Sequence, residues 1–189
     1  MTAIAVRNEE DMKHSAKNYL RSHADHAIEC QLLARILAFV PMSVQSALNT
    51  HNWHWQDLFR SGTLSYLTGR KGIYFGVAQA KTELSHAKAL NIAGYVGTAI
   101  GQSGLVGRIK NHLSRTYRLR DLASDRPKLF YKYTEGLIDK RRTLTFTVLA
   151  YFTFTPDESS KDTRTTLSNL VEATMMILLG TLETGDSSN

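Results

Sequence analysis

Residues 9–60 carry apolar side chains at the spacing of α-helices. The main stripe consists of Ile28, Leu32, Ile36 and Val40, widened by Leu33 and Leu37. Apolar residues that recur every three to four positions share one face of a helix, so we predict a helix that ends at Pro41. Ser43 is a candidate cap for a second helix. The segment 1–69 is therefore predicted to be helical, either as a layer packed on the following domain or as a small adaptor for a protein partner.

Beyond residue 70 the apolar pattern changes to that of β-strands. The segments 73–77 and 92–97 predict two short strands separated by polar residues. The strongest strand signal runs over 144–154, where one face carries Phe146, Val148, Ala150, Phe152 and Phe154. Because its other face is half apolar, we predict a central strand that helices cover on at least one face.

The helical spacing returns between and after these strands. Leu105, Ile109 and Leu113 predict an amphipathic helix over 104–114, and Pro127 separates it from a second helix over 129–140. A polar turn over 156–162 precedes a last helix over 163–182. This order predicts an α/β (α+β) domain over 70–183, in which helices flank a small three-stranded sheet. The polar residues 184–189 are expected to form a tail.

Positive charge is concentrated in the middle of the chain. The net charge is +6, but residues 71–143 hold fourteen Lys and Arg against five Asp and Glu. Basic clusters bind phosphates and release counterions, so we expect a polyanionic partner such as nucleic acid. The alternative is an ordinary solvated basic surface.

The composition also limits the compartment and rules out several classes of protein. The longest apolar run, residues 31–40, is shorter than the roughly 20 residues that span a bilayer and contains Arg35, so no membrane partner is predicted. Neither a secretory signal nor a mitochondrial presequence is recognisable. The single Cys30 cannot form an internal disulfide, which fits a reducing compartment. We therefore expect an intracellular protein of the nucleus or cytoplasm.

Two groups of side chains in the helical segment are candidate ligands or platforms. His23, His26 and Cys30 can share one helical face, and a second pair is His51 with His54. Neither group has the fourth ligand or paired cysteines of a structural zinc site. Trp53 and Trp55 can pack between the two parts of the chain or stack on bases, and we favour packing.

Glu172 is an unusual residue for its position. The surrounding helix is apolar nearly all round, with Leu170, Val171, Met175 and Leu179 close to it in sequence. A carboxylate in such a helix is expected to be partly buried, and a buried carboxylate requires a partner or a metal ion. A structural ion pair is the alternative.

Arg108 and His112 are four residues apart, so they share one face of the predicted helix. We expect Ile109 and Leu113 to anchor this helix while the polar pair faces a cleft. The guanidinium of an arginine binds phosphate through two hydrogen bonds and stays charged. Ordinary surface charge, as expected for Arg115, is the alternative.

These residues belong to an ordered set of motifs: Gly72-Ile73-Tyr74, Tyr95-Val96-Gly97, Arg108-x-x-x-His112 and Glu172. The set resembles the GIY-YIG nuclease family over about Arg70 to Leu182. The resemblance implies a GIY-YIG fold and a catalytic site made of Tyr74, Tyr95, Arg108, His112 and Glu172.

The same resemblance implies a metal-dependent endonuclease that hydrolyses DNA phosphodiester bonds. We expect DNA as the partner, with branched or damaged DNA as candidates. Glu172 would hold Mg²⁺ or Mn²⁺, Tyr74 would orient or deprotonate the attacking water, and Arg108 would stabilise the transition state. Tyr95 and His112 would position the phosphate, and Gly97 would let the backbone pass close to substrate or helix. Two alternatives stay open: a catalytically inactive GIY-YIG-like module that binds nucleic acid, and a helical interaction protein in which the tripeptides are coincidental.

Overall fold

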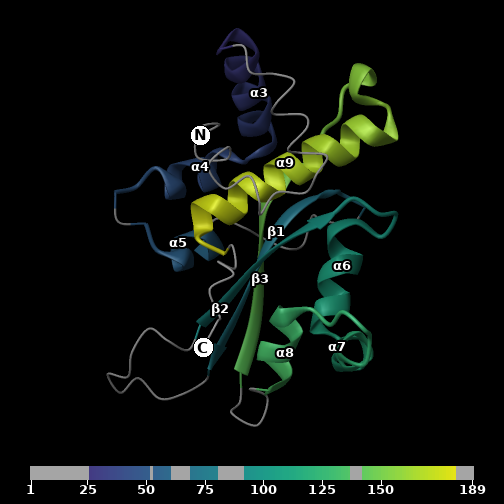
Figure 1. Cartoon of the computed structure of the whole chain (residues 1–189). Coiled ribbons are helices and arrows are strands. Elements are labelled where there is room, and N and C mark those ends of the chain that lie inside the picture. The colour runs from purple at the N-terminus through teal and green to yellow at the C-terminus, as the bar shows by residue number, and fades with distance from the viewer. Residues whose placement is uncertain (1–25, 52, 61–68, 81–91, 137–141, 182–189) are drawn as a thin grey trace.

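The computed structural model describes residues 26–51, 53–60, 69–80, 92–136 and 142–181. Within these ranges the elements follow in the order α3 (His26–Phe39), α4 (Met42–Leu48), α5 (Trp55–Arg60), β1 (Gly72–Ala80), β2 (Ile92–Ala99), α6 (Gly104–Leu113), α7 (Arg115–Leu122), α8 (Leu129–Gly136), β3 (Arg142–Tyr151), the short 3-10 helix η5 (Pro156–Glu158) and α9 (Lys161–Leu179) (Figure 1). The predicted class, a three-stranded sheet combined with helices, is confirmed. The first part of the segment predicted to be helical (residues 1–25), the end of the 129–140 helix and the tail over 184–189 lie outside the described residues.

The three strands form one antiparallel sheet in the order β2-β1-β3. The central strand is β1, so the prediction of a central strand over 144–154 is wrong, because β3 lies at an edge. The strand is nevertheless apolar on both sides, since Val148 and Leu149 enter core clusters on opposite faces. The apolar content of a strand depends on how well its two faces are covered. It does not depend on whether the strand is hydrogen bonded to one neighbouring strand or to two.

A β-bulge in β3 also changes its predicted alternation. Ile73 pairs with Ala150 and Tyr74 pairs with Val148, so Leu149 is an extra residue on β3. A bulge of this kind reverses the facing of the residues that follow it. The single predicted face therefore divides: Phe146 and Val148 lie in one core cluster, and Ala150, Phe152 and Phe154 pack in the other.

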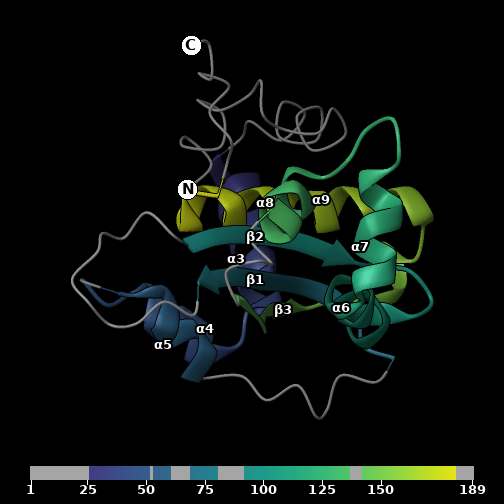
Figure 2. The same cartoon turned by 90° about the horizontal axis from the view of Figure 1, so that it is seen from below.

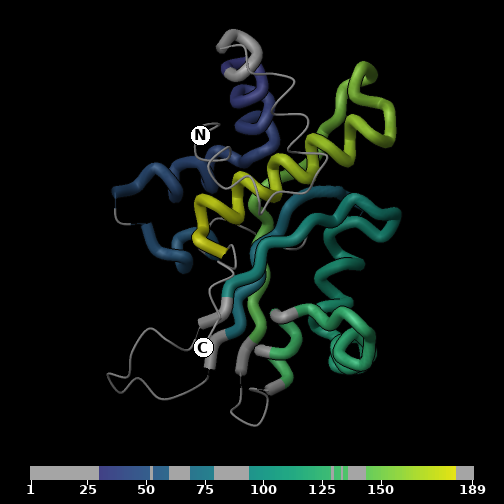
Figure 3. The backbone as a smooth tube through the Cα atoms, viewed as in Figure 1, coloured from purple at the N-terminus to yellow at the C-terminus, as the bar shows by residue number. Residues whose placement is uncertain are grey.

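Helices cover both faces of this sheet (Figures 1 and 2). The first core cluster joins Ile73, Phe75 and Val77 of β1 to residues of α3, α4, α5 and α9. The second joins Tyr74 and Ala78 of β1 to residues of α6 and α8. Alternate residues of β1 point to opposite faces of the sheet. Tyr74 therefore points to the face covered by α6 and α8, where the motif residues of β1, β2 and α6 meet. Figure 3 shows the chain passing from β2 into these helices.

The N-terminal helices contribute to the core of the sheet domain. Ile36 and Phe39 of α3, Val44 of α4 and Leu58 of α5 are buried in the first core cluster. Arg35 of α3 donates to both carboxylate oxygens of Glu158, through Nε at 2.6 Å and through Nη2. These contacts make the helices a layer on one face of the sheet.

Two local predictions on the helices are wrong. The position that precedes α4 is occupied by Pro41, whose ring fixes a φ of −56°, so Ser43 lies inside the helix and does not cap it. A separate helix α7 was not predicted. It starts directly after α6 because the Ser114 side chain accepts a hydrogen bond from the Tyr117 backbone N–H at 3.3 Å.

Helix α9 runs alongside the edge strand β2 and in the opposite direction (Figures 1 and 2). It begins where the Ser160 hydroxyl accepts from the Thr163 backbone N–H at 3.0 Å. It ends at Gly180, whose φ of 61° is a left-handed conformation that glycine adopts without strain.

No single helix in the described part of the chain is long and apolar enough to cross a membrane. The segments Cys30–Phe39 and Met42–Leu48 reach the required length and composition only together, and they are bent by 112° relative to each other.

Candidate active site

Tyr74 lies at the centre of a polar group on the α6–α8 face of the sheet. It comes from the central strand β1, and its side chain is completely buried. Its ring centroid is 6.1 Å from that of Tyr95 on β2 and 5.3 Å from that of His112 on α6. The Tyr74 hydroxyl and His112 Nε2 are joined by a hydrogen bond of 2.5 Å. Two motifs that are far apart in sequence therefore meet at one hydroxyl group.

The glycines of the two tripeptides make room for this arrangement. A Cβ on Gly97 would lie 2.4 Å from the Tyr74 hydroxyl oxygen and 2.7 Å from Tyr95 Cε1. A Cβ on Gly72 would lie 2.0 Å from the backbone oxygen of Ala150. Gly97 is thus required by the tyrosine side chains, which is a more specific reason than the predicted close approach of substrate or helix.

His112 is buried among aromatic rings, and both of its ring nitrogens are hydrogen bonded. Nε2 contacts Tyr74, and Nδ1 is 2.7 Å from the hydroxyl of Tyr131 on α8. Leu105 and Ile109 of α6 are buried on the same side of the helix, whereas Leu113 is 51% exposed. The prediction that Leu113 anchors this helix is therefore wrong. The buried face continues through His112 instead, and this imidazole lies inside the core, away from the open cleft that was predicted for it.

The imidazole of His112 is held neutral by its surroundings. Burial disfavours its charged form, and the positive charges of Arg108, Lys128 and Arg118 add to this effect. Together they lower the pKa of His112 to about 3. At neutral pH the ring therefore offers one N–H donor and one nitrogen acceptor to its two tyrosine partners.

The two tyrosines that flank His112 keep their protons. Burial raises the pKa of Tyr74 above its ordinary value, and Tyr95 adds to this, while Arg108 partly offsets it. Burial likewise raises the pKa of Tyr131. Both phenols are consequently hydrogen-bond donors at neutral pH.

Arg108 is the charged member of this group. Its guanidinium lies near enough to Tyr74 and Tyr95 to interact with them electrostatically, and Nη1 lies 3.5 Å from the hydroxyl oxygen of Tyr117, at the limit of a hydrogen bond. Its Nε is buried without a hydrogen-bond partner. Burial opposes the charge, but the neighbouring tyrosines Tyr74, Tyr95 and Tyr117 outweigh it and raise the pKa of Arg108. The side chain is half-buried, so it can accept an additional anionic partner.

Tyr95 is half-buried and stacks on Phe130 of α8, with ring centroids 5.0 Å apart. Its ring centroid is 5.4 Å from that of His112. Tyr95 and Arg108 are therefore the members of the group that retain exposed surface, while Tyr74 and His112 lie behind them.

Glu172 is buried as predicted, with 9% of its surface exposed. Thr181, just after α9, approaches Gly94 of β2, and a Cβ on Gly94 would lie 3.2 Å from Thr181 Cγ2. Glu172 lies near the middle of α9, the helix that packs beside β2.

The structure therefore brings together four of the five predicted site residues: Tyr74, Tyr95, Arg108 and His112. The helix neighbours of Glu172, Val171 and Met175, pack in the first core cluster, on the other face of the sheet from Tyr74. The convergence of Glu172 with the other four stays a prediction.

The donor chemistry of Glu172 suits a magnesium ion. Mg²⁺ prefers oxygen ligands, keeps several waters, and commonly binds through one or two carboxylates together with substrate phosphates. Glu172 would supply one such carboxylate, and it is nearly buried. Among the described residues there is no group of three His, Cys, Asp or Glu that could hold a metal ion.

The other candidate ligands are spread over the surface. Cys30, His51 and His54 are exposed, and His23 lies outside the described residues. Trp53 and Trp55 pack against the first core cluster, in agreement with the packing interpretation.

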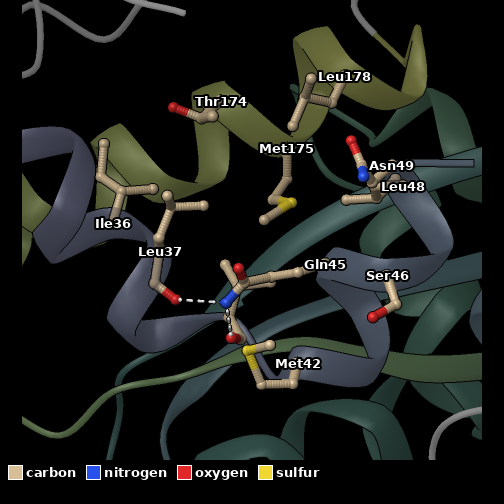
Figure 4. Close-up of a pocket in the computed structure, with 11 residues that line it drawn as sticks. Ile36, Leu37, Met42, Gln45, Ser46, Leu48, Asn49, Thr174, Met175 and Leu178 are labelled. Carbon is tan, nitrogen blue, oxygen red and sulfur yellow. Dashed lines mark hydrogen bonds between the residues drawn. The ribbon is translucent and has the colours of Figure 1, made fainter.

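A pocket of about 400 Å³ lies between α3, α4 and α9, away from this group (Figure 4). Its lining is mainly apolar, and the Gln45 side-chain amide donates to the backbone oxygens of Leu37 and Val40 at 3.1 and 2.8 Å. None of its lining residues is acidic or basic, so it offers no acid–base chemistry.

The motif reasoning missed residues on α7 and α8. These are Tyr131, which contacts His112, Tyr117, which contacts Arg108, and the buried ion pair of Arg118 with Glu135. Tyr131 and Glu135 are four residues apart, so they share one face of a helix. This spacing was the only indication in the sequence that the two side chains point to the same side.

No protein-family model matches this sequence, and no curated protein or solved structure matches it either. The resemblance to the GIY-YIG nucleases therefore rests on the motif residues themselves.

Proposed function

We propose that this protein is a metal-dependent endonuclease of the GIY-YIG type, which hydrolyses phosphodiester bonds in DNA. The observation that carries this proposal is the Tyr74–His112 hydrogen bond of β1 and α6 together with the Arg108 guanidinium, which interacts electrostatically with Tyr74. An arginine that is half-buried among three tyrosines has little structural purpose on its own, because even partial burial of a charge costs free energy. Its half-exposed guanidinium suits a phosphate anion.

Arg108 and Tyr95 are assigned to binding the scissile phosphate. They are the half-buried members of the group, and arginine carries a fixed fork of donors that matches phosphate oxygens. In the transition state, negative charge grows on those oxygens, so a preorganised guanidinium lowers the barrier.

Tyr74 is assigned to orienting or deprotonating the attacking water, and His112 to holding Tyr74 in place. The water oxygen attacks phosphorus, one P–O ester bond breaks, and the leaving oxygen takes up a proton. Tyr74 is fully buried, so this role requires a rearrangement that exposes its hydroxyl when substrate binds.

Glu172 is assigned to the divalent cation. When bound, Mg²⁺ or Mn²⁺ would polarise the phosphate and offset negative charge on the leaving oxygen. Its near-complete burial in α9 supports this assignment, because a buried carboxylate requires a partner or a metal ion.

The alternative of a catalytically inactive binding module is supported by a specific observation. The pKa of His112 is lowered to about 3 and that of Tyr74 is raised, so both groups are poorly suited to accept or release a proton at neutral pH. A phosphate bound by Arg108 without turnover would use the same site.

Cleavage of supercoiled plasmid by the full chain, with and without Mg²⁺, tests the proposal. The expected result is nicking that requires the metal and is reduced by about 10²–10³-fold in Arg108→Ala. Arg115→Ala is the matched control, since Arg115 begins α7 directly after α6 and its side chain is 68% exposed. It should weaken DNA binding only slightly. If the wild-type protein binds DNA without cutting plasmid, linear or branched substrates, the binding-module alternative takes precedence.

A further inference from the structure

A row of side chains leads from Arg108 onto the surface of α7, which packs beside α6 (Figures 1 and 2). Tyr117 of α7 contacts Arg108, with its hydroxyl oxygen 3.5 Å from Nη1. Arg120, about one turn further along α7, lies over the ring of the same tyrosine, with Cζ 5.1 Å from the ring centroid. Two guanidinium groups from two helices therefore meet at one tyrosine side chain.

The sequence of α7 explains why these side chains lie together. Tyr117 and Arg120 are three residues apart, so they share one face of the helix. The Ser114 cap places Tyr117 in the first turn of α7, and its ring packs beside that of Tyr131, with centroids 6.5 Å apart. Tyr117 is consequently half-buried and held in place, whereas Arg120 is exposed.

No carboxylate neutralises these two arginines within the part of the chain that the structure describes. Arg108 and Arg120 take part in none of the ion pairs between described residues. Asp121 follows Arg120 directly, but its carboxylate accepts from the backbone N–H of Lys128 at 3.0 Å and pairs with the Lys128 ammonium. The two arginines repel each other, so a partner with two separated negative charges would stabilise both at once.

This arrangement fits neighbouring phosphates of one nucleic-acid strand. Phosphates recur about every 3.4 Å of helix axis along a DNA strand, so a strand bound at Arg108 carries further phosphates within the span of one tyrosine side chain. The structural alternative is that Arg120 only balances the negative end of α7, in whose last turn it lies. That role does not require Arg120 to stack on the residue that contacts Arg108.

We propose that Arg120 is a second phosphate-binding residue, and that Tyr117 positions it beside Arg108 so that the two arginines bind neighbouring phosphates of one DNA strand. Arg108 binds the scissile phosphate, and Arg120 binds a phosphate close to it on the α7 side. The identity of the scissile phosphate rests on the proposed function, whereas the contact of Arg120 with DNA does not require turnover.

The direct test is the affinity of the full chain for a short fluorescein-labelled DNA duplex in EDTA, measured by anisotropy over a series of salt concentrations. Arg120→Ala should weaken binding by about 5–10-fold at low salt and should reduce the slope of log affinity against log salt by about 1, as expected for one lost phosphate contact. Circular dichroism checks that the variant is folded.

Arg115→Ala is the matched control, because it removes the same charge from the same helix. Arg115 lies two residues before Tyr117 and therefore on a different face of α7, and its side chain is 68% exposed. Its removal should leave the salt slope nearly unchanged. Tyr117→Leu removes no charge, but it should weaken binding because Arg120 loses the ring on which it stacks.

Cleavage kinetics in Mg²⁺ form the second readout. A contact made equally with bound substrate and transition state changes KM, so Arg120→Ala should raise KM for DNA by about 5–10-fold with kcat little changed. Arg108→Ala should instead lower kcat, because its guanidinium is assigned to the charge that develops at the scissile phosphate.

A folded Arg120→Ala protein with the wild-type affinity and salt slope would overturn the proposal. Equal losses in Arg120→Ala and Arg115→Ala would overturn it as well, because they would indicate diffuse surface charge. A wild-type protein that cuts no DNA, but whose affinity depends on Arg120 and Tyr117 as described, would refute the proposed function and leave the second phosphate contact standing.

Discussion

When the pH is lowered from about 7.5 to about 5, we expect the protein to lose stability because His112 is buried in its neutral form. The pKa of His112 is about 3 in the folded protein, against an ordinary value of 6.5 in an unfolded chain. At a pH between these two values, His112 is protonated in the unfolded state but stays neutral in the folded state. The stabilisation is therefore complete above about pH 6.5 and is lost progressively as the pH falls toward about 3.

The size of the effect follows from the two pKa values. One pKa unit corresponds to about 1.4 kcal/mol, so the full loss would approach about 5 kcal/mol at the acid limit. At about pH 5 the unfolded His112 is almost fully protonated while the folded one is not, and the loss is about 2 kcal/mol. For a chain of this size, that lowers Tm by about 4–8 °C.

The assay is urea or thermal unfolding of the wild type and of His112→Gln at both pH values. Glutamine does not titrate, and its amide can still donate to one tyrosine and accept from the other. All other histidines and carboxylates are common to both proteins, so their contributions cancel in the comparison. The wild type should lose about 2 kcal/mol more than the variant over this range.

Equal pH sensitivity of the two proteins would refute the reasoning. It would mean that His112 is protonated in the folded state near pH 6, and hence that the imidazole is not enclosed between Tyr74 and Tyr131 as described.

Three further predictions concern other parts of the molecule. Glu158→Gln should lower the free energy of unfolding by about 1–3 kcal/mol in urea titration, because it leaves Arg35 without its carboxylate partner. Asp157→Asn, a change at the exposed neighbouring residue, should have little effect. Gly97→Ala should lower the free energy of unfolding by about 1–3 kcal/mol, because its Cβ would overlap with the tyrosine side chains, and it should also reduce cleavage. Gly101→Ala, whose Cβ would have nothing within 4 Å, should leave the free energy of unfolding unchanged in the same assay. DNA affinity measured by fluorescence anisotropy should fall steeply between low and moderate salt because of the basic excess over 71–143, and a flat response would indicate a different partner.

Local patterns predicted most of the elements of the fold. The apolar spacing of α3, α6 and α9 and the alternation of β1, β2 and β3 correspond to elements that the structure contains. These signals are strong because each element buries one continuous stripe or face. The class, mixed α and β with a three-stranded sheet, could be read from their order.

The position of β3 in the sheet could not be read from its sequence. A strand covered on both faces is apolar whether it lies at the centre or at an edge, so composition alone does not distinguish the two. The bulge at Leu149 also depends on pairing with β1, which is a property of two strands together.

The candidate site was predicted in part. The motif residues Tyr74, Tyr95, Arg108 and His112 meet as expected, but Tyr131 comes from a helix that no motif marks. The burial of His112 was likewise missed, because a histidine four residues after an arginine does not reveal which way its ring points. Side-chain direction became clear only with the packing of α6 on the sheet.

The most direct test of the central claim is cleavage of plasmid DNA in Mg²⁺ by Glu172→Ala, with DNA binding measured on the same samples. Glu172 is asked to hold the cation, so we predict that cleavage is abolished while the fold and DNA affinity are largely retained. Asp162→Ala, which removes an exposed carboxylate from the first turn of the same helix, should cut at the wild-type rate. A folded Glu172→Ala protein that cuts as fast as the wild type would contradict the account, because the carboxylate of α9 would then take no part in the reaction.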